Sequence, residues 1–162
     1  MPPLPIDLRR NLEKAVLRAR DAAEHGASNA LTVLAVAEER AYETLTGEQR
    51  ALRNGLRARV RVLAPSDTTH RAGKGHPRGF GPLVEEVAYE QWHRMLFARF
   101  LEANHLLIHP RHGVAVSLEE CAELARDEGE PDEWMVAAKF ASEMLPGIFR
   151  RDDPAAQVRF AV

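Results

Sequence analysis

Residues 84–104 decide the fold, and they read VEEVAYEQWHRMLFARFLEAN. The second half of this stretch, Met95 to Leu101, is apolar on every side except at Arg99. A helix that is apolar all round belongs in the interior of a helical protein. The stretch therefore predicts a central helix that is buried on all sides.

Further helices are expected around this central one because apolar residues recur at helical spacing. Gly26 follows the first periodic segment as a stop, and Ser28 can cap the next. Capping boxes at 46–49 and 117–120 begin two more helices. The five additional helices are expected at about 6–25, 28–44, 47–63, 118–127 and 132–145.

Two segments do not follow helical periodicity. Residues 65–82 are rich in Gly, Pro and basic residues, and they predict a long loop that is either functional or mobile. Residues 106–108 and 114–116 flank a turn and predict a short hairpin or merely two packed extended segments. The sequence thus predicts an all-α fold, a single helical bundle of about six helices over 1–162, with one short hairpin as an option.

The composition is that of an ordinary globular protein, with 45% hydrophobic and 28% charged residues among 162. No apolar run approaches the roughly 18 residues that a membrane span needs, and the start lacks the regions of a signal peptide. A cytoplasmic location without a membrane partner is therefore expected. The single cysteine, Cys121, suits a reducing compartment, and its helical surroundings predict a small core residue rather than a nucleophile.

Charge is divided unevenly along the chain. Residues 1–80 carry 14 Lys and Arg against 9 Asp and Glu, whereas residues 81–162 carry 8 against 15. This asymmetry indicates a side that faces a polyanion, or two halves that dock on each other.

A row of arginines is the strongest candidate for a contact surface. Four of them are spaced 3, 4 and 4 residues apart, so they share one narrow arc of the helix expected at 47–63. Residues 50–78 contain eight basic residues and one acidic residue, a footprint typical of nucleic-acid binding. The alternatives are internal or interdomain pairing, for example with the acidic run 119–133, and plain solvation. The candidate contacts to DNA phosphates are Arg50, Arg53, Arg57, Arg61, Arg71, Lys74 and Arg78.

Residues that could carry catalysis or bind a metal do not form a set. Lys74 lies in a glycine-rich segment, but no Ser or Thr follows it, as a phosphate loop would require. His109 and His112 are close enough in sequence to share a metal, but no Cys or acidic ligand stands at a fixed offset from them. We expect no catalytic residue, no metal and no bound cofactor in this chain.

Two residues of the central stretch are expected to be structural anchors. An unpaired buried charge costs several kcal/mol, so Arg99 should be paired with Glu102, Glu85 or a carboxylate elsewhere. Trp92 is most simply a core aromatic residue, with base stacking as the alternative.

Residues 84–104, with His105 to Pro110 and Met144 to Phe149, resemble the N-terminal helical region of large S-adenosylmethionine-dependent, adenine-specific DNA methyltransferases. These are the type IIG-like restriction-modification methylases and the related phage-exclusion methylases. The resemblance is clearest over 84–154. It implies an accessory module of a DNA adenine-N6 methyltransferase in restriction-modification or phage defence, with S-adenosylmethionine as the cofactor of the parent enzyme.

The catalytic motifs of that family are absent from this sequence. The family's glycine-rich donor turn is missing, and so is its Asn/Asp-Pro-Pro-Tyr/Phe loop, because the only Pro-Pro is Pro2-Pro3. The resemblance therefore implies that this chain works with DNA and with a catalytic methyltransferase domain or partner subunit. The alternative is a non-enzymatic protein–protein docking module of a defence complex.

Overall fold

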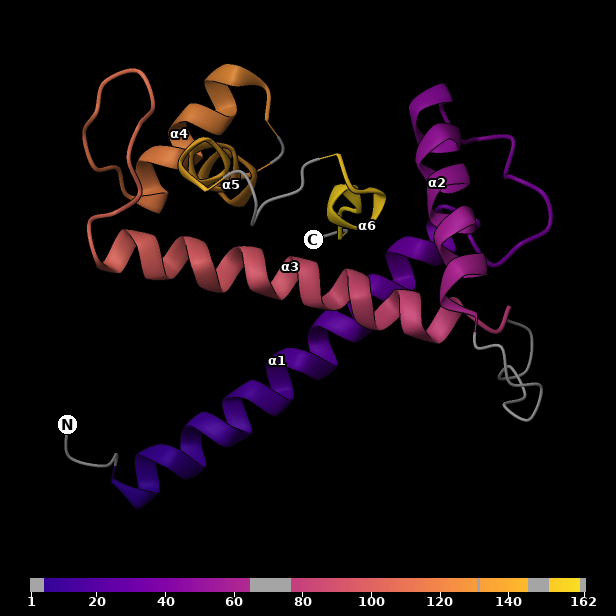
Figure 1. Ribbon diagram of the computed structural model, residues 1–162, viewed down its shortest axis with the longest axis horizontal. Helices are drawn as coiled ribbons and strands as arrows, with labels where there is room; N and C mark the ends of the chain where they lie inside the picture. Colours follow the sequence, from indigo (N-terminus) through magenta and orange to yellow (C-terminus); the bar gives the residue numbers. More distant parts are fainter. Residues whose placement is uncertain (1–4, 65–76, 131, 146–151, 161–162) are drawn as a thin grey trace. The chain divides into compact units, whose positions relative to one another are not determined.

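The computed structural model describes residues 5–64, 77–130, 132–145 and 152–160. Within these ranges the chain is helical and has no strand, so the predicted all-α class is confirmed. The six helices are α1 (Ile6–Val33), α2 (Gly47–Leu63), α3 (Phe80–Ala103), α4 (Leu118–Glu128), α5 (Glu133–Met144) and α6 (Pro154–Gln157) (Figure 1).

The chain contacts itself in two compact units. Unit 1 comprises residues 1–89 and 157–162, and unit 2 comprises residues 90–156. Helix α3 begins in unit 1 and ends in unit 2, so both units share one continuous helix. No helix in the described part of the chain is long and apolar enough to cross a membrane.

Helices α2 and α4 begin at the capping boxes that the sequence predicts. The Gln49 N–H donates to Thr46 Oγ1 at 3.3 Å, and the Thr46 N–H donates to Gln49 Oε1 at 2.9 Å. The same reciprocal pair joins Ser117 and Glu120, with N···O distances of 2.7 and 3.1 Å. These bonds satisfy N–H groups that have no partner inside the helix.

The predicted break at Gly26 is wrong, because α1 continues through this residue to Val33. Gly26 serves packing instead. A Cβ atom at this position would lie 2.7 Å from Cδ2 of Phe160, so the absence of a side chain lets that ring approach the helix.

Helix α1 ends at Val33 and is terminated by Ala35, two residues further on, which has the left-handed φ of 53°. The Val36 N–H then donates to the Leu31 carbonyl at 3.0 Å, in the pattern that terminates many helices. Glycine usually occupies this position, so nothing in the sequence marked the stop. The helix expected at 28–44 does not form, because residues 34–46 are turns, bends and extended backbone.

Helix α3 begins at Phe80, inside the segment predicted to be a loop, and residues 65–76 of that segment lie outside the described residues. Pro82 falls in the first turn, where the missing N–H costs nothing. The start of α3 lies tightly against α2, because a Cβ atom on Gly79 would be only 1.9 Å from the Val60 carbonyl oxygen. Only glycine fits this approach.

Unit 2 has its own core, in which α4 and α5 lie side by side and pack with the end of α3. Cys121 is fully buried here, as predicted. The expected hairpin is reduced to one antiparallel bridge between Ile108 and Ala115. The core residues are Ala98, Leu101, Leu107, Leu118, Cys121, Ala125, Val136, Ala137, Phe140 and Ala141.

The prediction that residues 95–101 are buried on all sides is wrong. Ala98 and Leu101 are buried, whereas Leu96 and Phe100 remain 52% and 53% exposed. Within unit 2, the core packs on one face of α3 and leaves the other face open.

We predict that Gly79→Ala lowers the free energy of unfolding by about 2–4 kcal/mol, because the new methyl group meets a backbone carbonyl that cannot move aside freely. Gly81→Ala is the matched control, since nothing lies within 4 Å of a Cβ atom there. Alanine is the better helix former, so this control should be neutral or stabilising by up to about 1 kcal/mol. Urea unfolding of both variants measures the difference, and equal stability would contradict the close contact.

Candidate functional site

Arginines of α2, proposed above as DNA contacts, bind backbone carbonyls within unit 1. Nε of Arg53 donates to the Ala35 oxygen at 3.0 Å, and its Nη2 donates to the Glu38 oxygen at 2.7 Å. Nη1 of Arg57 donates to the Val36 oxygen at 3.0 Å and also to that of Glu38. Both guanidinium groups therefore hold the irregular segment that follows α1.

Arg50 binds the far end of the same segment. Its Nε donates to the Leu45 oxygen at 3.0 Å, and its Nη2 donates to the Glu43 oxygen at 3.1 Å. Side-chain donors on three successive turns of α2 thus contact carbonyls between residues 35 and 45. We call this set the arginine clamp: Arg50, Arg53 and Arg57.

Arg53 is the most buried member of the clamp, with only 6% of its surface exposed. It shares the buried face of α2 with Leu56 and Val60, so the row of arginines does not face solvent at this position. Burial, and then the positive charges of Arg57 and Arg50, lower the pKa of Arg53 from its ordinary value. Its hydrogen bonds to carbonyls offset the cost of burying the charge.

The remaining DNA candidates have other positions. Arg61 and Arg78 are exposed, whereas Arg71 and Lys74 lie outside the described residues. The neighbouring Arg59, which the sequence did not single out, forms a bidentate ion pair with Glu86 of α3. Its Nε donates to the two carboxylate oxygens at 3.0 and 3.1 Å. Arg61 and Arg78 are therefore the described candidates that take no part in the carbonyl contacts of the clamp.

We predict that Arg53→Gln lowers the free energy of unfolding by about 2–3 kcal/mol, because it leaves buried carbonyls without donors. Arg61→Gln, an exposed change on the same helix, should stay within about 0.5 kcal/mol of the wild type. Urea denaturation followed by circular dichroism gives both values. Equal effects of the two substitutions would mean that the clamp does not hold the segment.

The buried arginine of α3 is Arg94, which the sequence did not indicate. Arg94 is 8% exposed, and its guanidinium donates to Met135 Sδ at 3.1 Å and to the Ala156 carbonyl. Its position could have been found from spacing, because residues 94, 98 and 101 lie on one helical face, and Ala98 and Leu101 are buried.

Arg99 lies on the open face of α3. It pairs with Glu102, one of the three alternatives considered, at an Nη1–Oε2 distance of 2.9 Å, but its side chain is 65% exposed. Its guanidinium carbon is 5.8 Å from the ring centre of Trp134. Trp92 is half-buried. The expected burial of Arg99 is therefore wrong, although the ion pair is present.

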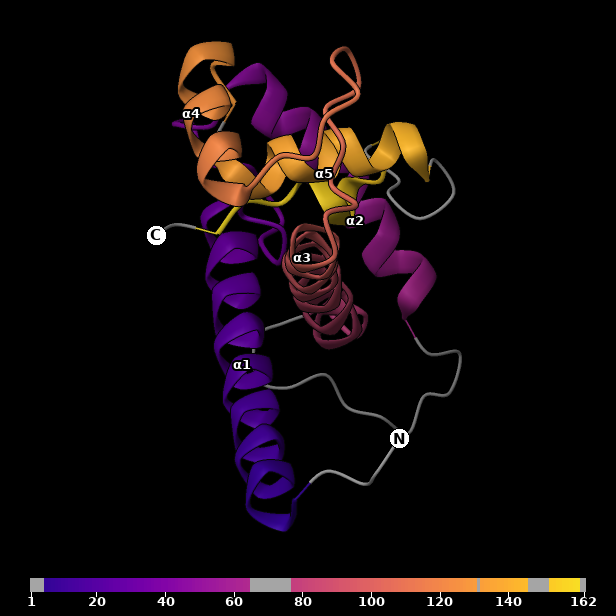
Figure 2. The same ribbon diagram turned by 90° about the vertical axis from the view of Figure 1, so that its left-hand side faces the viewer.

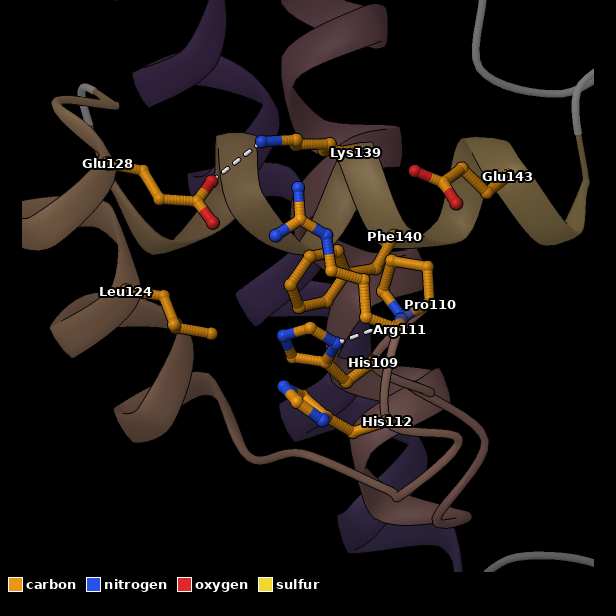
Figure 3. Close-up of a pocket in the computed structure, with 9 residues that line it drawn as sticks. All are labelled: His109, Pro110, Arg111, His112, Leu124, Glu128, Lys139, Phe140 and Glu143. Atoms are coloured by element: carbon orange, nitrogen blue, oxygen red, sulfur yellow. Dashed lines mark hydrogen bonds and ion pairs between the residues drawn. The ribbon is translucent and has the colours of Figure 1, made fainter.

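A pocket of about 390 Å³ opens in unit 2 beside the bridge at 108–115 (Figure 3). Lys139 Nζ contacts Glu128 Oε2 at 2.6 Å, and this hydrogen bond lowers the pKa of the Glu128 carboxyl. In Figure 3 the Arg111 side chain extends toward Lys139. The pocket is lined by His109, Pro110, Arg111, His112, Leu124, Glu128, Lys139, Phe140 and Glu143.

The two histidines of this pocket contact each other as tilted rings, and His109 also contacts Phe140. The His109 ring centre is 4.9 Å from that of Phe140 and 4.5 Å from that of His112. The Arg111 backbone N–H donates to His109 Nδ1 at 3.2 Å. No group of three His, Cys, Asp or Glu residues in the described part of the chain is placed to hold a metal ion.

Cys121 is a free, fully buried thiol in the folded protein. Burial raises the pKa of its thiol to about 11, and nearby carboxylates add to the shift.

We predict that Cys121 does not react with a thiol-specific disulfide reagent at pH 8 in the native state, and that it reacts fully in urea. The thiol of the unfolded chain ionises near its ordinary pKa of 9.0, below the pKa of the folded chain. Ionisation of Cys121 therefore lowers the free energy of unfolding as the pH rises above about 9. Rapid native labelling would contradict the burial.

The first half of α1 presents an uncovered apolar face. Residues 6–22 are all exposed, including Leu8 at 52%, Leu12 at 53% and Val16 at 45%. This part of the helix extends away from α2 in both views (Figures 1 and 2). We call the apolar row on it the α1 stripe: Leu8, Leu12, Ala15, Val16, Ala19 and Ala23.

Comparison of the chain with protein-family models, with curated proteins and with solved structures finds no match. The function of this chain is therefore inferred from the α1 stripe, the arginine clamp and the pocket.

Proposed function

We propose that this chain is a non-enzymatic helical docking module that binds a protein surface through the α1 stripe. The observation that carries the proposal is the exposure of Leu8, Leu12 and Val16 along one face of a regular helix. Covering half-exposed aliphatic side chains contributes roughly 1 kcal/mol for each of them, so a partner that covers the stripe stabilises both itself and the helix.

The resemblance to adenine-specific DNA methyltransferases supplies the proposed setting. In that setting the module belongs to a restriction-modification or phage-defence system and joins a catalytic methyltransferase domain or subunit, which carries the S-adenosylmethionine. A DNA-contacting accessory module is the second candidate, supported by the exposure of Arg61 and Arg78. Protein docking is preferred because Arg50, Arg53 and Arg57 are engaged with backbone carbonyls.

We predict that the triple substitution Leu8→Gln, Leu12→Gln and Val16→Gln leaves the free energy of unfolding within about 1 kcal/mol of the wild type at low protein concentration. The three side chains contribute little to the monomer core, and glutamine is a good helix former. Leu31→Gln is the control on the same helix: Leu31 is fully buried, and its loss should cost about 3 kcal/mol or more. Comparable destabilisation by both variants would mean that the chain covers the stripe itself, and the docking proposal would fail.

The DNA alternative is measured with a labelled duplex by fluorescence anisotropy over a range of salt concentrations. The docking proposal expects no binding that weakens steeply with salt. Salt-dependent binding that is reduced for several duplex sequences alike by Arg61→Gln with Arg78→Gln would favour the DNA-contacting module instead.

A further inference from the structure

The two ends of the α1 stripe differ in side-chain size. Leu8 and Leu12 lie toward its start, whereas Ala19 and Ala23 lie toward its end. A parallel copy of the helix would place Leu against Leu at one end and Ala against Ala at the other, which leaves crowding and a gap. An antiparallel copy places the Leu end of each helix against the Ala end of the other, with Val16 near its own counterpart at the centre, and this fills the space more evenly.

The charges on one flank of the stripe are complementary to themselves in an antiparallel pair, in which the same flank of each helix meets. Arg9, Glu13, Arg20 and Glu24 are spaced 4, 7 and 4 residues apart, so they share one flank of α1, next to Val16. Reversing the helix sets Arg9 against Glu24 of the copy, and Glu13 against Arg20. In a parallel pair this flank would face the opposite flank of the copy, so these four charges would not meet one another. Exposed ion pairs contribute little to affinity, so they select the orientation more than the affinity.

Arg20 and Glu24 are already held on this flank. Arg20 Nε lies 2.6 Å from Glu24 Oε1 within the helix. Arg9 of an antiparallel copy would extend this pair into a network, in which charges cooperate more than in an isolated pair.

The covered part of α1 favours the same orientation. Ala27 and Ala30 continue the face of the stripe, and the chain itself buries them. In a parallel pair, the buried ends of both helices, at Ala27 and Ala30, would lie beside each other, where each face is already covered by its own chain. In an antiparallel pair, the buried end of one helix lies past the start of the other, beyond Ile6.

We infer that the α1 stripe docks on the α1 stripe of a second copy of this chain, with the two helices antiparallel. The inference rests on the proposed docking function and names its partner. The expected ion pairs join residue 9 of one copy to residue 24 of the other, and residue 13 to residue 20. Both pairs have their midpoint between positions 16 and 17, so the two-fold axis of the dimer passes there.

Cysteine cross-linking of the full chain tests the orientation, with Cys121 buried and out of reach. Val16→Cys lies beside the axis and should give a cross-linked dimer with a short bis-maleimide. Leu8→Cys should not, because its counterpart would be about 25 Å away along the helix pair. Cross-linking of both variants, or of neither, would overturn the antiparallel pair.

Sedimentation equilibrium, from low micromolar to near-millimolar concentration, tests the charge register. Glu13→Arg should weaken the dimer about tenfold, because two symmetric ion pairs become repulsive. Adding Arg20→Glu should restore the affinity to within about threefold, since the pairs re-form with reversed signs. Asp21→Arg makes the same charge change on the opposite side of α1 and is the control. Weakening by both single variants alike, or no rescue, would overturn the register.

A monomer at every concentration would overturn the pairing with a second copy but not the docking function. That function fails if the triple glutamine variant is destabilised like Leu31→Gln. The two failures are therefore distinguishable on the same set of proteins.

Discussion

The contact between the arginine clamp and the segment after α1 is the constraint on which unit 1 depends. Residues 35–45 form no helix or strand, so their carbonyl groups lack the partners that regular structure provides. Guanidinium groups are suited to this role because each offers several donors in a fixed fork. Glu38, Glu39 and Glu43 lie in the same segment, and their backbone oxygens accept hydrogen bonds from the clamp.

A row of basic residues in a sequence does not by itself distinguish DNA binding from internal contacts, and the arginine clamp shows the reason. Spacing established that the arginines share an arc of α2, but it could not reveal what lies opposite them. Internal pairing was considered with the acidic run 119–133, whereas the observed partners are backbone oxygens, which have no sequence signature. The arginines of α2 thus divide by their contacts, because exposed Arg50 binds backbone carbonyls with Arg53 and Arg57, whereas exposed Arg61 lies outside the clamp.

The elements that could be predicted are those fixed by local bonds. The boxes at Thr46 and Ser117 join residues three positions apart, so the starts of α2 and α4 were readable from the sequence. The continuation of α1 through Gly26 depends on the Phe160 ring, far away in sequence, and its end depends on an alanine in a conformation usual for glycine. Arg94 was overlooked because overall apolarity, rather than the spacing from Ala98 and Leu101, guided the choice of Arg99.

Helix α1 combines a buried anchor with an uncovered extension. Its 28 residues form one helix, and the buried members, Ala27, Ala30 and Leu31, all lie in the last third. Because the end of the helix is anchored, extension toward Ile6 needs no new nucleus, and residues of high helix propensity such as Arg, Lys, Ala and Leu favour it. A partner that binds the extension therefore meets a surface that is already ordered. Less conformational entropy is lost on binding, so even a narrow apolar stripe can support association.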